Sequence, residues 1–319
     1  MSDAYLVGAV RTPMGRGKPD GALHTVHPVH LLSQTLNEAC TRAGISHDHV
    51  EDVIAGCVTP TAEQGANIAR LSLLHAGFPV EVPGVQINRM CGSSQQAVHF
   101  ASQAVAAGDM DLAIAGGIEM MGRVPMGTDW GVLTPEFLQD YPYELNPMGI
   151  CAEMIADKWD FSREQLDAFS AESHHRAGKA REAGWFEGEI MPVTVGQNGS
   201  TTVVSQDEGI RANVSVEKMG TLKPAFKENG KITAANASQI SDGAAALVIA
   251  SDRKASELGL KKRARIVTRV VVGSDPQLTL TGPIPATQKA LERAGLGIDD
   301  IDAIEINEAF ASVVLAWAA

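Results

Sequence analysis

An internal repeat is the feature that most restricts the fold of this chain. The segment LNEACTRAGI at 36–45 resembles QKALERAGL at 288–296, and each is followed by a polar turn and an apolar run. Both copies are typical of a helix that ends at an Ala-Gly pair and leads into a strand, at 50–56 and 301–307. We therefore expect two similar β/α halves, with chance similarity of helix–Gly–strand units as the alternative.

The rest of the chain alternates between short apolar runs and helical periodicity, which predicts the α/β class with a mainly parallel sheet. The expected strands are 4–10, 53–58, 85–87, 112–115 (ended by Gly116-Gly117), 244–250, 265–272 and 301–306. The expected helices are 29–43, 66–76, 93–107, 152–157, 163–183, 286–294 and 309–317, with Ser162 as an N-cap.

The alternation of apolar runs and helical periodicity is lost between 121 and 240, where 191–235 is polar and is predicted to be rich in loops. We interpret 1–120 as an N-terminal half, 121–240 as an insertion folded over it, 241–265 as a return to that half and 266–319 as the start of a second half. Long loops of this kind are usually functional. Few residues follow Asn307 compared with the first copy, so we expect the second half to be incomplete.

Charge and cysteine content restrict the partners. Lys and Arg total 26 against 38 Asp and Glu, a net charge of −12 that argues against binding to nucleic acid or to an anionic membrane. Cys40, Cys57, Cys91 and Cys151 form no CxxC pair, so we expect no metal site, and we interpret His24, His27 and His30 as solvated. Scattered cysteines, no secretory signal and no long apolar run favour the cytoplasm.

The stretch NRMCGSSQQAV at 88–98 is the most informative about chemistry. It places Cys91 at a turn between a strand and a helix of small residues, where the helix N-terminus favours a thiolate. Gly92 and the two serines after it let a substrate approach the backbone. We predict that Cys91 is a nucleophile; the alternative is a small buried cysteine.

Asn307 stands at the matching end of the predicted strand in the second half. Its amide could hold a water or polarise a carbonyl. An Asn that caps the following helix fits the sequence equally well.

The stretch around Cys91, AGGIEMM at 115–121, ASQISDGAAA at 237–246 and NEAFA at 307–311 together resemble a thiolase (acyl-CoA acetyltransferase). The resemblance extends from RTPMG at 11–15 onward. It implies the thiolase fold: two similar βαβαβαββ halves in a five-layer αβαβα arrangement plus a loop domain that binds coenzyme A.

The resemblance also implies roles for single residues. Cys91 would accept the acyl group, and Asn307 would hold the water of an oxyanion hole. The residues implied to contact coenzyme A or the acyl group are Arg211, Ser238, Phe226, Ala234, Met148 and Phe310; core packing is the alternative for Phe226, Met148 and Phe310.

Two expected segments do not occur among these residues. A thiolase continues with a Gly-His-Pro segment, whose histidine activates the nucleophile, and a Cys-x-Gly-Gly segment, whose cysteine is the acid/base of the second half-reaction. Pro147 also stands where short-chain biosynthetic thiolases have a histidine before Met-Gly. This departure favours a degradative enzyme.

The function implied is CoA-dependent thiolytic cleavage of a 3-ketoacyl-CoA through a cysteine acyl-enzyme, in fatty acid or lipid degradation. Coenzyme A would be a substrate, no cofactor would be needed, and the enzyme would be a homodimer or a dimer of dimers. The alternatives are a biosynthetic acetoacetyl-CoA thiolase, a ketoacyl synthase, which tends to have a histidine where Asn307 stands, and a non-catalytic acyl-CoA or lipid-binding protein.

Overall fold

The computed structural model describes residues 3–197, 200–211 and 213–319. The chain forms two compact units. Residues 1–130, 185–209 and 240–266 make up the first unit, and 131–184, 210–239 and 267–319 make up the second.

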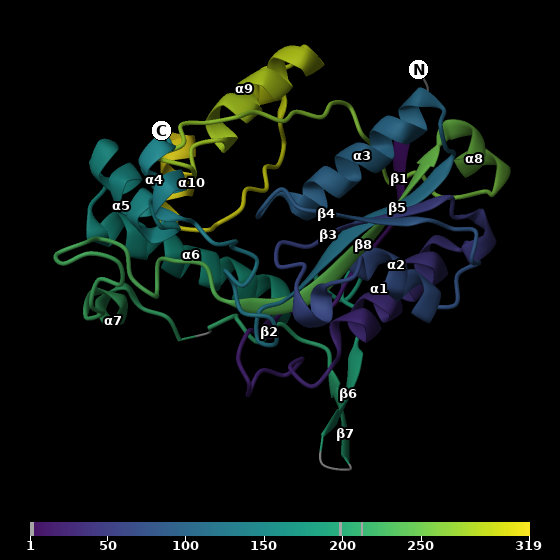
Figure 1. Cartoon of the computed structure of the whole chain (residues 1–319), viewed down its shortest axis with the longest axis horizontal. Helices are drawn as coiled ribbons and strands as arrows, with labels where there is room; N and C mark the ends of the chain where they lie inside the picture. Colours follow the sequence, from purple (N-terminus) through teal and green to yellow (C-terminus); the bar gives the residue numbers. More distant parts are fainter. Residues whose placement is uncertain (1–2, 198–199, 212) are drawn as a thin grey trace. The chain divides into compact units, whose positions relative to one another are not determined.

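The first unit is a sheet covered by helices (Figure 1). Its strands are β1 (Ala4–Arg11), β2 (Gly15–Arg16), β3 (Asp52–Gly56), β4 (Gly84–Ile87), β5 (Leu112–Met120), β6 (Val193–Gln197), β7 (Ser200–Val204), β8 (Ser241–Ser251) and β9 (Ala264–Arg265). Its helices are α1 (Pro28–Ala43), η1 (His47–His49), η2 (Ala62–Gln64), α2 (Ile68–His75), α3 (Ser93–Ala107) and α8 (Asp252–Glu257).

The main sheet is mixed. The strand order is β4-β3-β5-β8-β1-β9, and β2 also pairs with β8. The neighbours of β3 are parallel to it, whereas β8 is antiparallel to both β5 and β1. The expectation of a mainly parallel sheet was therefore wrong, because β8 enters from a distant part of the sequence and reverses the direction at the centre.

Alternate residues of the strands face opposite layers of helices. Val53, Leu112 and Val248 belong to a core cluster with α1 and α2, whereas Ile54 and Ala113 belong to a cluster with α3. This period of two is the expected geometry of a strand with both faces covered. Figure 1 shows α3 on one side of the sheet and α1 and α2 on the other.

Two glycines let α3 lie directly on the sheet. Gly56 of β3 and Gly117 of β5 are neighbours in register. A Cβ at Gly56 would lie 2.4 Å from the backbone nitrogen of Ser94, and one at Gly117 would lie 2.0 Å from Ser94 Oγ. Strand β5 also continues through Gly116-Gly117, where we expected it to end, because β8 pairs along its full length.

The regular elements that the structure describes in the second unit are helices. It contains α4 (Pro135–Asp140), α5 (Met148–Lys158), α6 (Arg163–Glu182), α7 (Val216–Gly220), α9 (Pro283–Ala294), η3 (Ile298–Asp300) and α10 (Ala311–Ala318). Ser162 caps α6 as predicted, in a capping box with Gln165. Residues of α5, α6 and α10 share one core cluster, which includes Ile155, Leu166 and Val313.

The repeat holds in its helices and turns. Helices α1 and α9 both end at a left-handed glycine, Gly44 (φ 72°) and Gly295 (φ 67°), and a short 3-10 helix follows each. The strand that follows in the first copy, β3, has no counterpart at 301–308. The expected strand 301–306 was therefore wrong, because a strand needs a hydrogen-bonded neighbour and no described segment pairs with this one.

Two other expectations need correction. The predicted strand 265–272 is reduced to its first residue, Arg265, which pairs with β1 as part of β9. The predicted loop region 191–235 contains the hairpin of β6 and β7 and the short helix α7.

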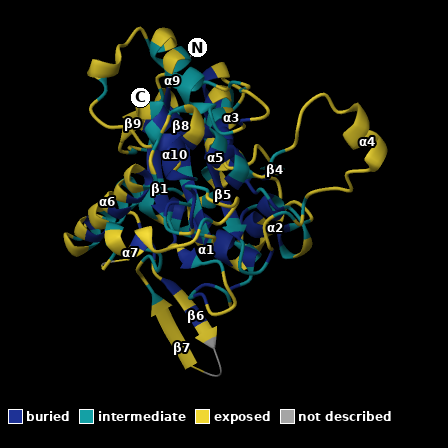
Figure 2. Ribbon diagram, turned by 90° about the vertical axis from the view of Figure 1, so that its left-hand side faces the viewer, coloured by how far each residue is buried: buried dark blue, intermediate teal, exposed yellow. Residues whose placement is uncertain are grey.

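The segment that carries α4 is strongly exposed (Figure 2). Its apolar side chains include Trp130, Val132, Phe137 and Leu138, and Val132 is 90% exposed. None of the helices formed by the described residues combines the length and the apolar character that a membrane span requires.

We predict that Gly56→Ala destabilises the protein. The added Cβ would meet backbone atoms of Ser93 and Ser94, so α3 must shift, at a cost of about 1–3 kcal/mol for overpacking. Gly178→Ala in α6 is the matched control, because its Cβ would meet open space. There we expect no loss or a gain of about 0.5–1 kcal/mol. Urea denaturation measures both, and a Gly56→Ala variant as stable as the unmodified protein would contradict the close contact.

Candidate active site

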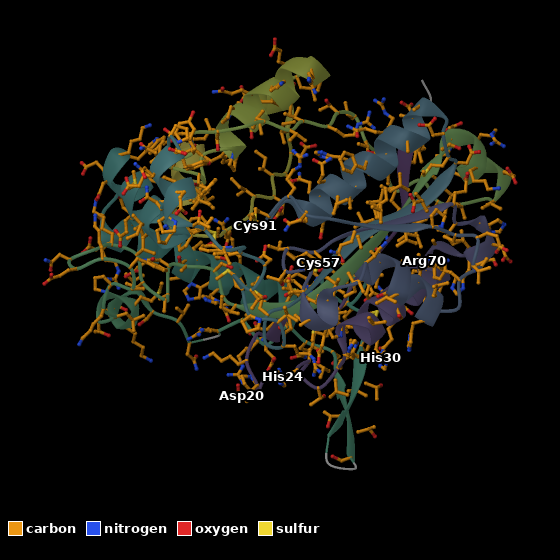
Figure 3. All side chains as sticks on the ribbon, viewed as in Figure 1. Asp20, His24, His30, Cys57, Arg70 and Cys91 are labelled. Carbon is orange, nitrogen blue, oxygen red and sulfur yellow. The ribbon has the colours of Figure 1, made fainter. Side chains whose placement is uncertain are left out.

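Cys91 lies in the turn that joins β4 to α3, and Figure 3 labels its side chain. It is exposed. Gly92 is the N-cap of α3 and offers no side-chain cap, and the Ser93 N–H donates to the Met90 carbonyl at 3.0 Å. This agrees with the predicted placement of a sulfur at a helix N-terminus.

The turn before Cys91 is sharp and tightly held. Met90 has a φ of 47°, in the left-handed region that non-glycine residues rarely adopt. Its N–H donates to Asn88 Oδ1 at 2.8 Å. Ser93 Oγ accepts from the Arg89 N–H at 2.9 Å and donates to the Met90 carbonyl at 2.5 Å. The turn is thus fixed on both sides of Met90.

The other three cysteines are buried. Burial raises the pKa of the Cys40 and Cys57 thiols to about 12. Cys151 Sγ lies 3.2 Å from the carbonyl oxygen of Gln277, to which it can donate. Cys91 therefore differs from the other three in its access to solvent.

The remaining predicted site residues lie in the second unit. Three of the apolar ones are grouped there: Phe226 meets Phe310 edge-on at 5.9 Å between ring centroids, and Met148 packs against the same core cluster as Phe310. Gly149 makes room for Phe226, since a Cβ there would lie 2.1 Å from the ring. Phe226 is 42% exposed, so one side of its ring is open to a ligand.

A buried carboxylate shapes the loop that carries Ala234. Glu153 of α5 is fully buried and accepts hydrogen bonds from the Lys231 and Ile232 N–H groups, each at 2.8 Å. A carboxylate that accepts two backbone N–H groups is well compensated for burial. Ala234 is exposed in the turn that follows.

A second buried carboxylate holds the same loop further along. Asn236 Nδ2 donates to Asp167 Oδ1 at 2.8 Å, and Asn236 Oδ1 accepts from the Thr233 N–H at 2.9 Å. Arg163 Nε donates to the other oxygen of Asp167 at 2.8 Å. This ion pair compensates the charge that α6 buries under the loop.

Ser238 and Asn307 lie on two segments that hydrogen-bond to each other. The Ser238 N–H donates to the Ala309 carbonyl at 2.9 Å, and the Ala311 N–H donates to the Asn236 carbonyl at 3.0 Å. Both Ser238 and Asn307 are exposed. Glu308 Oε2 accepts from Ser173 Oγ of α6 at 2.7 Å, which anchors the residue after Asn307.

The environment of Asn307 corrects two expectations. It does not end a strand, because 301–308 is not a strand. It also does not cap the terminal helix, since the N-cap of α10 is Phe310. Its amide is therefore free of the alternative structural role that the sequence allowed.

Arg211 is exposed, and its backbone N–H donates to His174 Nδ1 at 3.3 Å. Burial, and then the nearby Arg211 charge, lowers the pKa of His174. A neutral imidazole is the form that can accept this hydrogen bond at Nδ1. His174 thus fixes the backbone at Arg211.

The sequence reasoning missed the side chains that hold these segments. Asp167, Ser173 and His174 all belong to α6 and bind the three segments that carry Ser238, Asn307 and Arg211. The available signal was Asp167 and His174, which are seven residues apart and so share a face of the predicted helix. Among the described residues, no group of three or more His, Cys, Asp or Glu side chains could hold a metal ion.

Comparison with known proteins gives a consistent result. Residues 4–253 match the family described as "Thiolase, N-terminal domain", and residues 260–319 match "Thiolase, C-terminal domain". A "Steroid 3-ketoacyl-CoA thiolase FadA6" of Mycobacterium tuberculosis is 46% identical over 99% of this chain and 79% of that protein. A "3-ketoacyl-CoA thiolase" of Aliivibrio fischeri is 43% identical over 98% of this chain and 81% of that protein.

A solved structure is also similar. The acetyl-CoA acetyltransferase of Bacillus anthracis superposes with a TM-score of 0.91 at 38% sequence identity, covering 99% of this chain and 82% of that one.

We predict that iodoacetamide labels Cys91 in preference to the other cysteines near neutral pH. Cys40 and Cys57 stay protonated until the pH approaches about 12, and Cys151 is buried. Peptide mass spectrometry of the folded protein measures the four rates, with Cys91→Ser as the control. Equal labelling of all four thiols in folded protein would show that the Cys91 turn confers no advantage.

Proposed function

The chain belongs to the thiolase family and has the thiolase fold, and from this premise we propose that it is an acyl-CoA C-acyltransferase that cleaves 3-ketoacyl-CoA with coenzyme A. The observation that carries the proposal is Cys91, an exposed thiol held in a tight turn at the N-terminus of α3. The similarity to 3-ketoacyl-CoA thiolases over nearly the whole chain supports the same reaction.

In the first step, the Cys91 thiolate attacks the 3-keto carbon of the substrate. A bond forms between Sγ and this carbon, and the bond between C2 and C3 breaks. The electron pair stays on C2 as the enolate of acetyl-CoA, which takes up a proton and leaves. In the second step, the thiolate of free coenzyme A attacks the Cys91 thioester, which releases the shortened acyl-CoA and restores Cys91.

We propose that Asn307 takes part in the oxyanion hole, where donors that are already in place stabilise developing charge. Its exposed amide, which does not cap α10, supports this role. Glu308, bound to Ser173, would hold Asn307 in place.

The coenzyme A and acyl contacts are proposed for the second unit, and all of them except Phe310 lie within the insertion that we placed at 121–240. Arg211 offers a cation to the nucleotide phosphates, and Ser238 and Ala234 offer exposed positions along the pantetheine. The exposed ring of Phe226 supports a place beside the pantetheine, with Met148 and Phe310 nearer the acyl group. Coenzyme A is a substrate in this scheme, and we propose no other cofactor because every step moves electron pairs without a redox change.

A degradative role is favoured over biosynthesis of acetoacetyl-CoA. Pro147 precedes Met148 and Gly149, where a histidine would be expected in the short-chain biosynthetic branch. The relatives named as 3-ketoacyl-CoA thiolases reach 42–46% identity, above the 38% of the acetyl-CoA acetyltransferase. We propose the cytoplasm as the location, which the four free thiols support.

We predict that acetyl-CoA transfers one acetyl group to Cys91 and that Cys91→Ser abolishes the transfer. The substitution Asn307→Ala is made in the enzyme as its source organism produces it. In thiolytic cleavage, this variant should have a kcat lower by about 10²–10³, with little change in KM. Gln288→Ala, an exposed amide on α9, is the matched control and should leave both constants unchanged.

Peptide mass spectrometry locates the acetyl group, and the loss of 3-ketoacyl-CoA measures cleavage at several chain lengths. An intact enzyme that binds acyl-CoA without acylating Cys91 would instead support the non-catalytic binding protein.

We propose a homodimer, or a dimer of dimers, on the basis of two exposed apolar surfaces. Strand β4 lies at one edge of the described sheet, where Val85 is 41% exposed. An unpaired edge is a template for pairing with a second copy. The exposed apolar segment around α4 offers a further surface for association.

We therefore predict a mass of twice 33.7 kDa or more in sedimentation equilibrium at micromolar concentration. Val85→Asp should shift the protein toward the monomer, because it places a charge on the pairing edge. Val80→Asp, at an exposed position outside the strand, should not. A monomeric unmodified protein would contradict the proposal.

A further inference from the structure

We propose that Asn88 and Glu119 are positioning residues for Cys91, joined through Val58 by a hydrogen-bonded path that runs from the end of β5 to the turn before α3. The importance of Cys91 for turnover rests on the proposed function. The hydrogen-bonded path does not depend on that function, because the path acts only on the geometry of the Cys91 thiol.

The path begins at the carboxylate of Glu119, near the end of β5. Glu119 accepts a hydrogen bond from the Val58 N–H at 2.7 Å, from Gln64 Nε2 at 2.7 Å and from the Thr59 hydroxyl. Thr59 and Gln64 are almost completely buried. Hydrogen bonds to an ionised acceptor are about twice as strong as neutral ones, so the segment after β3 is held firmly.

Gln64 closes this network on the sheet. Its Oε1 accepts from the Met120 N–H at 2.7 Å, while its Nε2 donates to Glu119. The side chain therefore satisfies both a backbone donor and the carboxylate beside it. Val58 and Thr59 are fixed to the end of β5 as a result.

Asn88 carries the path from Val58 to the turn. Its Nδ2 donates to the Val58 carbonyl at 2.9 Å, and its Oδ1 accepts from the Met90 N–H at 2.8 Å. Val58 thus uses its N–H for Glu119 and its carbonyl for Asn88. Both ends of the Asn88 amide are engaged, and this fixes the orientation of the amide.

Met90 needs such support because its φ of 47° is unfavourable for a residue with a side chain. On the far side of the turn, Ser93 lies close to the sheet through the contact with Gly56. Ser93 holds the far side of the turn through Arg89 and Met90, and Asn88 holds the near side through Val58. Loss of Asn88 should let Met90 relax and move the Cys91 sulfur away from the helix N-terminus.

A positioning role differs measurably from a contribution to the core. Asn88 is exposed, so its truncation creates no cavity and should change the free energy of unfolding little. The rate at which Cys91 reacts should change nevertheless. Glycine tolerates the left-handed region without strain, so Met90→Gly should restore part of the lost rate in a variant that lacks Asn88.

The experiment measures the second-order rate of Cys91 alkylation by iodoacetamide in the full chain, with circular dichroism and thermal unfolding as checks on folding. Asn88→Ala should lower the rate about two- to fivefold, the factor that a helix N-terminus gives to one negative charge. Glu119→Gln should act in the same direction from the far end of the path. The double variant with Asn88→Ala and Met90→Gly should recover part of the rate.

Asn67→Ala is the matched control. Asn67 also makes two hydrogen bonds, to the Arg70 N–H and the Gly84 carbonyl, but at the start of α2. It should leave the Cys91 rate unchanged. An unchanged rate in Asn88→Ala and Glu119→Gln, an equal loss in Asn67→Ala, or no recovery with Met90→Gly would overturn the proposal.

Alkylation needs no substrate, so the two proposals can fail separately. If Cys91 of the intact enzyme is not acylated by acyl-CoA while the path variants slow alkylation, the thiolase activity fails and the positioning role stands. If acyl-CoA acylates Cys91 and the path variants do not change the rate of Cys91 alkylation, the positioning role alone is wrong.

Discussion

The close seating of α3 on the sheet is the constraint on which the site of Cys91 depends. It exists because Gly56 and Gly117, neighbours in register on β3 and β5, leave no side chain between the strands and Ser94. The rest of the helix continues the contact with small residues, including Ala97 and Ala101. A larger residue at either glycine would lift the end of the helix that presents the thiol.

In the second unit, polar contacts hold the segments of the candidate site in place. Helix α6 binds three separate segments, through Asp167 to Asn236, Ser173 to Glu308 and His174 to the backbone of Arg211. The buried charge of Asp167 is compensated by Arg163. These segments run over the surface of the unit, so their shape depends on such anchors.

Much of the fold and part of the site could be predicted from local signals. Ser162 and Gly44 mark helix ends through their own backbone and side-chain preferences, and Cys91 was placed correctly before a helix of small residues. The strand 301–306 was predicted by the same logic and is absent, because an apolar run becomes a strand only when another strand pairs with it. The prediction that the strand ends at Gly116-Gly117 was also wrong. There, pairing with β8 overrides the local tendency of glycine to end a strand.

The sequence by itself thus determined the strongly periodic helices such as α1, α3 and α6, the helix–glycine turn of the repeat and the thiol at the turn, all of which depend on neighbours within a few residues. Only the tertiary structure decided that β8 enters the sheet antiparallel, and that Glu119 reaches Asn88 through Val58. The physical reason is that these hydrogen bonds join residues far apart in the chain. No local preference encodes which distant segments meet, since the packing of the whole unit selects them.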